Sequence, residues 1–142
     1  MAEIDPRIIK FFNRHHVLTL ATSVDNQPWC ANCFYVYHQE ENCLVFTTDD
    51  DTRHGREFEI NPVVSGSVVL ETSVVGKIQG IQFQGLVSRP GNDLLKTAKR
   101  AYLLRFPVAA LMNTSLWIIS LTHIKMTDNR LGFGKKLVWK RD

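Results

Sequence analysis

Seven short segments of strand-like composition follow one another along the chain, and this recurrence restricts the fold more than any other feature. Each is rich in β-branched or aromatic residues, and turn-forming residues or short helical segments separate them. They cover residues 17–23, 29–38, 43–48, 63–71, 77–89, 116–127 and 135–141. Three helical segments are expected at 6–15, 52–60 and 94–106. Since most strands are joined by hairpins and the helices are few, we expect a mainly β fold: a six- to seven-stranded antiparallel barrel with a few peripheral short helices.

Several local signals refine this expectation. The helix at 52–60 should end before Pro62, because the residue preceding a proline is disfavoured in helical geometry. Asn92 and Asp93 are expected to cap the third helix. Gly80 and Gly85 interrupt a strand-like segment, which predicts a bulge or a close backbone approach at each.

Length and composition exclude several classes of protein. A chain of 142 residues is expected to form one domain, residues 1–142, with a core that needs no disulfide or metal. No apolar run approaches the roughly 20 residues of a membrane span, and the acidic first residues do not resemble a signal peptide. The net charge of +3 is too small to indicate nucleic-acid binding. Three cysteines, an odd number, favour a reducing compartment, so we expect a cytoplasmic protein.

Cys30 and Cys33 form a C-x-x-C pair that could indicate redox or zinc chemistry. Redox pairs of this kind lie at a helix N-terminus, which stabilises the thiolate. This pair lies in a predicted strand, where residues three apart point to opposite faces. A structural role is therefore favoured over a redox pair, and a zinc site recruiting His15, His16 or Cys43 is favoured least.

The segment TTDDDTRH, residues 47–54, places hydroxyls, an arginine and a histidine where a strand ends and a helix begins. A helix N-terminus carries unpaired N–H groups and partial positive charge, so it can bind an anion. Threonine hydroxyls can donate to phosphate oxygens, and the guanidinium of Arg53 matches phosphate bidentately. The simpler interpretation is a helix cap followed by a solvated arginine. The three aspartates at 49–51 oppose an anion site unless they point outward.

The order of elements around this corner resembles the flavin-binding split-barrel proteins related to pyridoxamine 5'-phosphate oxidase. The corner reads T-x-x-x-[ST]-R-x and is followed by a helix, N-P and a strand. The stretches WCAN, TRH, GIQFQG, LLRFP and TDNRLGFGKKLVW are similar to the small bacterial YhbP-type branch of that family. The resemblance covers nearly the whole chain, and it implies a split barrel that binds FMN.

Carried over to this chain, the resemblance implies roles for particular residues. Thr48, Thr52 and Arg53 match the groups that bind the FMN phosphate, and His54 stands where lysine is usual. The strand segment 32–37 should run along the flavin. The implied cofactor-binding residues are Asn32, Cys33, Phe34, Tyr35, Thr47, Thr48, Thr52, Arg53, His54, Gln82, Lys135 and Trp139.

Departures from the oxidase limit what the resemblance implies about activity. Asn32 replaces an arginine of the oxidase, and the oxidase residues that bind the substrate phosphate have no counterpart. We therefore expect an FMN-dependent oxidoreductase acting on an unidentified small substrate, not the oxidase itself, with no catalytic residue assigned. The alternative is a non-enzymatic module that binds flavin or an anionic partner. The resemblance also implies a homodimer with the flavin at its interface.

Overall fold

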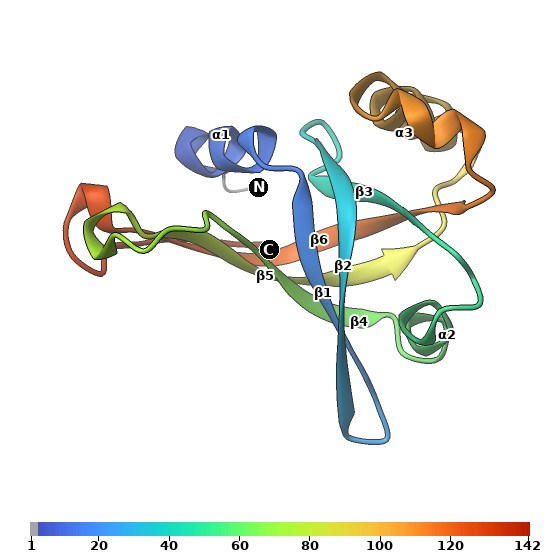
Figure 1. Cartoon of the computed structure of the whole chain (residues 1–142), viewed down its shortest axis with the longest axis horizontal. Helices are drawn as coiled ribbons and strands as arrows, with labels where there is room; N and C mark the ends of the chain where they lie inside the picture. Colours follow the sequence, from blue (N-terminus) through green and yellow to red (C-terminus); the bar gives the residue numbers. More distant parts are fainter. Residues whose placement is uncertain (1–2) are drawn as a thin grey trace.

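The computed structural model describes residues 3–142, which form seven strands and three α-helices (Figure 1). The strands are β1 (Val17–Val24), β2 (Gln27–His38), β3 (Cys43–Thr48), β4 (Val63–Val69), β5 (Gln79–Ser88), β6 (Ser115–Asp128) and β7 (Lys136–Lys140). The helices are α1 (Pro6–Arg14), α2 (Arg53–Ile60) and α3 (Asn92–Arg105), with short 3₁₀ turns η1 (Val75–Lys77), η2 (Pro107–Leu111) and η3 (Asn129–Leu131).

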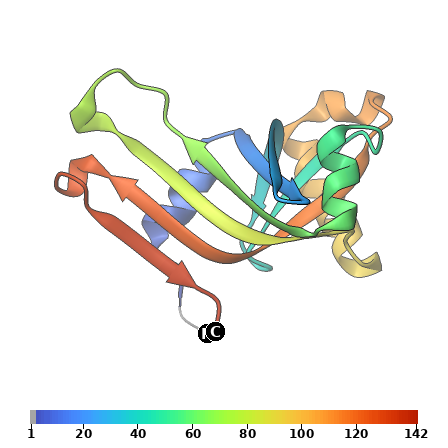
Figure 2. The ribbon, with the colours of Figure 1, turned by 90° about the horizontal axis from the view of Figure 1, so that it is seen from below.

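All strand pairs are antiparallel, and six strands close into a barrel. The sheet order is β3-β2-β1-β4-β5-β6-β7, and a further pairing of β3 with β6 closes the ring. β7 pairs with β6 outside the closure. Figure 2 shows β7 as the outermost strand beside the long β5 and β6. The predicted mainly β barrel with peripheral helices is therefore confirmed.

The barrel opens where β2 and β3 separate. Their pairing ends at Tyr35 and Phe46. Beyond this point β2 continues beside β1 alone, and β3 continues beside β6 until Thr48 pairs with Ser115. In Figure 1, β2 runs on into its hairpin with β1 while β3 leads away toward α2. α3 lies beside the two diverging strands and contacts both of them.

Apolar side chains form two separate clusters. The main core fills the barrel, and α1 adds Ile8, Phe11 and Phe12 to it. The second cluster lies between α3 and the outer surface of the barrel, and consists of Cys43, Val45, Ala98, Tyr102 and Ile118. Successive residues of β3 alternate between the two clusters because strand side chains alternate between faces.

The structure tests the local predictions made for Gly85, Gly80 and the start of α3. At Gly85 the β5–β6 register shifts, and an added Cβ would lie 2.6 Å from the Ser120 carbonyl oxygen, so this prediction is confirmed. At Gly80 the register is regular and a Cβ would make only ordinary contacts, so that prediction was wrong. Gly66, which was not singled out, is as crowded as Gly85. The N-cap of α3 is Gly91, whose backbone alone begins the helix, so the predicted Asn92–Asp93 cap was wrong.

Within residues 3–142, no helix combines the length and apolar character needed to cross a membrane. The same part of the chain contains no group of three or more His, Cys, Asp or Glu side chains placed to hold a metal ion. Cys30, Cys33 and Cys43 are all free thiols.

Candidate functional site

Thr52 organises the corner between β3 and α2. It is the N-cap of α2: its Oγ1 accepts a hydrogen bond from the Gly55 N–H at 3.1 Å and donates to the Asp49 carbonyl oxygen at 2.8 Å. Thr52 is thus a helix cap, as the simpler interpretation of this segment predicted. The N–H groups of Arg53 and His54, at the first two helical positions, have no intrahelical acceptor and point out of the helix start.

His54 lies against the two threonine hydroxyls. Its Nε2 is 2.6 Å from Thr48 Oγ1 and 3.3 Å from Thr52 Oγ1. The Thr52 hydroxyl donates its own proton to the Asp49 carbonyl oxygen. An N–H group at Nε2 of His54 can therefore donate to both threonine hydroxyl oxygens. Burial lowers the pKa of His54, so its ring is neutral near pH 7. In this arrangement the Thr48 hydroxyl proton can be directed either to Thr52 Oγ1, 3.5 Å away, or to an acceptor outside the network.

Arg53 is held beside the corner by two contacts. Its guanidinium lies 4.2 Å from the centroid of the Trp29 ring, and its Nε donates to Glu57 at 3.2 Å. Glu57 also accepts from Thr22 at 2.7 Å. The Thr22 hydrogen bond, followed by Arg53, lowers the pKa of Glu57 and keeps it ionised. The contact with the Trp29 ring and the hydrogen bond from Nε to Glu57 restrict the Arg53 guanidinium. Neither contact involves its terminal N–H groups, which can still donate to a ligand.

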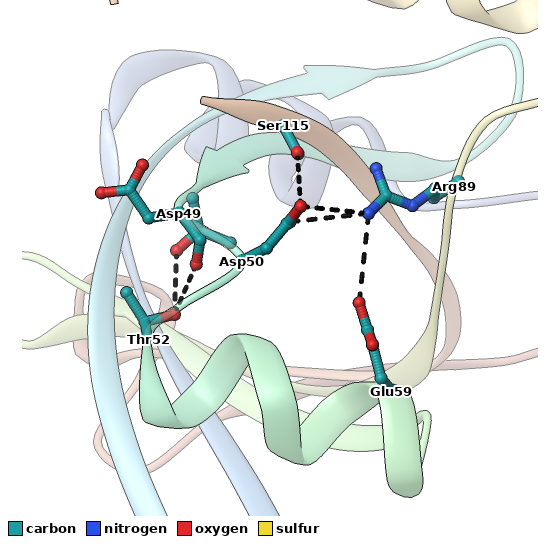
Figure 3. A network of polar contacts seen from close by, with 7 residues as sticks. Asp49, Asp50, Thr52, Glu59, Arg89 and Ser115 are labelled. Carbon is teal, nitrogen blue, oxygen red and sulfur yellow. Dashed lines mark hydrogen bonds and ion pairs between the residues drawn. The ribbon is translucent and has the colours of Figure 1, made fainter. Parts of the chain in front are cut away.

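The aspartates of the corner point in different directions (Figure 3). Asp50 turns toward β6 and β5, where it accepts from Ser115 at 3.1 Å and from Arg89 at 3.4 Å. Arg89 also lies 4.0 Å from Glu59 of α2 and stacks over the Trp117 ring. Arg89 therefore compensates the charge of Asp50 at a distance from the helix start. Asp50 consequently does not oppose the binding of an anion there.

A cavity of about 600 Å³ lies beside this corner, in the opening between β2 and β3. Its size falls within the range of small-molecule sites. Six of the residues predicted to bind cofactor line it: Asn32, Cys33, Phe34, Thr47, Thr48 and Thr52. Arg53 and His54 do not line it, although they begin the adjoining helix. Asp49 is the acidic residue among those that line it.

The opposite wall comes from the end of α3 and from η2, and sequence reasoning did not assign it to the site. Tyr102, Arg105 and Phe106 line the cavity there. Thr47 donates to the Tyr102 hydroxyl at 3.1 Å, and the Phe34 and Phe106 rings are 5.2 Å apart. The helical periodicity placed Tyr102 and Arg105 on one face. Periodicity alone does not distinguish a face that covers a core from one that walls a cavity.

Four other predicted residues lie away from this cavity. Tyr35 is enclosed in the core, with its hydroxyl donating to the Phe12 carbonyl at 2.7 Å. Gln82 is exposed on β5, Lys135 is exposed before β7, and the Trp139 side chain is buried on β7.

The distance along β6 shows how far apart these groups are. Thr48 pairs with its first residue, Ser115, whereas Lys136 pairs with Thr127 near its other end. A strand of that length extends about 40 Å. One copy of the chain therefore does not bring Lys135 and Trp139 to the corner.

Gln82 nevertheless shares a surface with the cavity residue Asn32. Cross-strand pairing forms a row on the outer face of the barrel, from Asn32 to Thr19, Ser67 and Gln82. With a strand spacing near 4.8 Å, Asn32 and Gln82 are about 14 Å apart. Thr19 donates to the Asn32 amide oxygen at 2.9 Å and so fixes its orientation.

The cysteine pair shows no redox geometry. Cys30 is exposed and Cys33 is buried, as expected for opposite faces of a strand. Burial raises the pKa of Cys33 to about 11, so its thiol stays protonated and is a poor nucleophile or metal ligand.

Comparisons with known proteins establish the relatives and the fold. No protein-family model matches the chain. A UPF0306 protein of Photorhabdus laumondii is 44% identical over 134 residues, which cover 94% of each chain.

Among solved structures, a heme-binding protein of Mycobacterium smegmatis has a TM-score of 0.79 at 19% identity; the match covers 99% of this chain but spans only 60% of that one. A FAD-binding protein of Mesorhizobium loti has a TM-score of 0.72 at 14% identity over 87% of this chain and 94% of its own. A candidate pyridoxamine 5'-phosphate oxidase of Listeria innocua has a TM-score of 0.66 at 15% identity over 86% of this chain and 96% of its own. At these identities the structural likeness establishes the fold alone.

Proposed function

This chain belongs to the UPF0306 family, and within that family we propose that it is an FMN-binding protein whose flavin occupies the cavity between β2, β3 and α3. One observation carries the proposal. Thr48 and Thr52, the N-cap of α2, line an apolar-walled cavity, and the next two residues, Arg53 and His54, carry N–H groups without an intrahelical acceptor. That combination suits a ligand with an anionic end and a flat, largely apolar body.

The phosphate would be held at the start of α2. The Arg53 and His54 N–H groups and the Thr48 hydroxyl supply neutral donors, and Arg53 supplies the charge. The Trp29 stack and the Glu57 bond already restrict the Arg53 guanidinium, so less side-chain entropy is lost on binding than for a mobile arginine. Neutral His54 orients Thr48 from behind and adds no charge of its own.

The flavin ring would lie between the β2 wall and the α3 wall. Phe34 and Phe106 provide aromatic surface, and the oriented Asn32 amide provides a polar group at its edge. FMN, when bound, supplies hydride or electron transfer, while the chain contributes binding, orientation and exclusion of water.

Heme is the competing cofactor, because proteins of this fold include a heme-binding one. Heme iron requires an axial ligand such as histidine, thiolate, tyrosine or methionine. Among the described residues, no histidine lines the cavity, and the Cys33 thiol is protonated. Tyr102 already accepts from Thr47, and Met112 is an exposed side chain. These features favour flavin over heme.

A homodimer would complete the site. Lys135 lies too far from the corner to act within one chain, so a second copy would have to supply it, whereas Trp139 is buried in the core of its own chain. The outer-face row from Asn32 to Gln82 carries small and amide side chains, which suit a flat contact. We expect dimers in light scattering at micromolar concentration, with well above about 1,000 Å² buried. A flavin-loaded monomer would contradict this part of the proposal.

An oxidoreductase acting on a small substrate is the proposed activity, and a flavin carrier is the alternative. A second cavity shares part of the α3 wall with the first, which favours a second ligand beside the flavin. The cytoplasmic location indicated by the cysteine count stays a prediction.

Titration of FMN, riboflavin and hemin into the parent protein tests the proposal. We expect flavin absorbance to stay with the protein through gel filtration, and riboflavin to bind more weakly because it lacks the phosphate. Arg53→Ala should weaken FMN binding about ten- to a hundredfold, since a charge-assisted contact contributes about 1.5–3 kcal/mol. Riboflavin should hardly respond to this change.

Arg56→Ala is the matched control, because Arg56 is an exposed arginine on the same helix. Equal losses of FMN and riboflavin in Arg53→Ala would show that Arg53 supports the fold instead of the phosphate. Tighter binding of hemin than of FMN by the parent would overturn the flavin assignment.

A further inference from the structure

A second cavity of about 580 Å³ adjoins the proposed flavin cavity. It lies between α3, η2 and the ends of β3 and β6. Five residues line both cavities and form the shared wall: Thr47, Tyr102, Ala109, Met112 and Thr114. A ligand in the second cavity would therefore be separated from the flavin by side chains of this wall alone.

The walls of the second cavity are mainly apolar, with a single charged group. Leu95, Leu103 and Leu116 provide hydrocarbon surface, and Lys99 provides the charge. No carboxylate within residues 3–142 forms an ion pair with Lys99. The helix that carries it has four cationic residues and one acidic residue, so its local potential is positive.

Tyr102 adds a hydrogen-bond donor beside this cation. The side chain is 4% exposed, and its hydroxyl accepts a hydrogen bond from Thr47. Its own proton has no acceptor in the described part of the chain, although buried hydroxyls normally donate as well. Lys99 and Tyr102 are three residues apart on α3, which makes them neighbours on one helix surface. A cation and an unused hydroxyl donor thus face the same cavity.

We propose that this second cavity binds a small amphiphilic monoanion, a medium-chain carboxylate, as the substrate or a product of the protein. The carboxylate would lie against Lys99 and the Tyr102 hydroxyl, and the hydrocarbon part would lie against Leu103 and Leu116. The substrate role rests on the proposed flavin function; the binding itself does not.

Octanoate is the probe, followed by methyl chemical shifts of Leu103 and Ala110 in the protein without added flavin. We expect saturable shifts of these methyl groups, and weaker binding of 1-octanol, which has the same chain without the charge. Lys99→Gln should weaken octanoate binding about two- to fivefold, the range for an exposed ion pair, and leave 1-octanol unaffected. Lys96→Gln, on the same helix but outside this cavity, is the matched control and should change nothing.

Ala110→Phe fills the cavity and should abolish the shifts of Leu103. Equal binding of octanoate and 1-octanol, or equal losses in the two lysine variants, would overturn the proposal. The same samples are then titrated with FMN. Octanoate binding without FMN binding would leave this site standing and remove the flavin proposal. FMN binding without octanoate binding would leave the flavin proposal standing and overturn the proposed carboxylate site.

Discussion

The helices α2 and α3 both adjoin the candidate site, α2 through its N-cap Thr52 and α3 through Tyr102 and Arg105, but they are attached to the barrel in different ways. Phe58 anchors α2 in the main core, where its ring packs edge-on against Trp117 at 4.6 Å and against Phe46 at 6.0 Å. α3 instead rests on the outer surface of the barrel, through Ala98 and Tyr102 of the second cluster.

This difference separates the two halves of the candidate site. The proposed phosphate end shares the stability of the barrel core, so its donors are held in place before a ligand arrives. The α3 wall depends on a small cluster, and local stability follows the number of buried apolar contacts. We therefore expect changes on α3 to alter one wall without unfolding the barrel, whereas changes under α2 affect the whole molecule.

The largest effect is expected for Phe58→Ala. Removal of a buried phenyl ring from a core costs about 3–5 kcal/mol in the free energy of unfolding. Ile60→Ala on the same helix is the control, since Ile60 is 71% exposed, and should change stability by less than about 0.5 kcal/mol. Urea denaturation measures both. A cost below about 1 kcal/mol for Phe58→Ala would mean that α2 is no better anchored than α3.

A smaller and more local effect is expected for Ala98→Leu, which overfills the cluster under α3. Overpacking typically costs about 1–3 kcal/mol. Hydrogen exchange should show faster exchange in α3 with little change in β1, β4 and β5, and FMN should still bind. Thr97→Leu, at an exposed neighbouring position, should leave exchange unchanged. Uniformly faster exchange across the barrel would contradict the proposed independence of the α3 wall.

The smallest effect concerns pH. Burial lowers the pKa of His54, so the unfolded chain takes up this proton at a higher pH than the native protein does. Stability should therefore fall as pH drops through the ordinary histidine pKa near 6.5. In His54→Gln, which keeps a donor for Thr48, that fall should be shallower. His15 has a lowered pKa too and remains in both proteins, so only the difference between them reports on His54. Identical pH profiles would show that His54 does not contribute.

The strand pattern was predictable because it is local. Alternation of side chains, the threonine cap of α2 and the end of that helix before Pro62 all depend on residues a few positions apart. The prediction at Gly85 was also correct, whereas Gly80 has the same sequence signal without the crowding. A strand glycine is required only where another element approaches closely, and that depends on the partner strand.

The candidate site was only partly predictable for the same reason. Thr48 and Thr52 are positioned by the turn that contains them, so the corner motif located them. The orientation of Arg53 depends on Trp29, and the second wall depends on Tyr102 and Arg105, which are about fifty residues away in sequence. A spacing rule contains no information about such contacts.

By itself, the sequence determined a mainly β barrel with a hydroxyl-rich corner at the start of its second helix, since these features follow from periodicity and capping. The tertiary structure alone decided that β3 closes on β6, that β2 and β3 part beyond Tyr35 and Phe46, and that α3 covers the gap. Closure and cavity formation join segments distant in sequence. They are selected by the packing of the whole barrel, which no local pattern records.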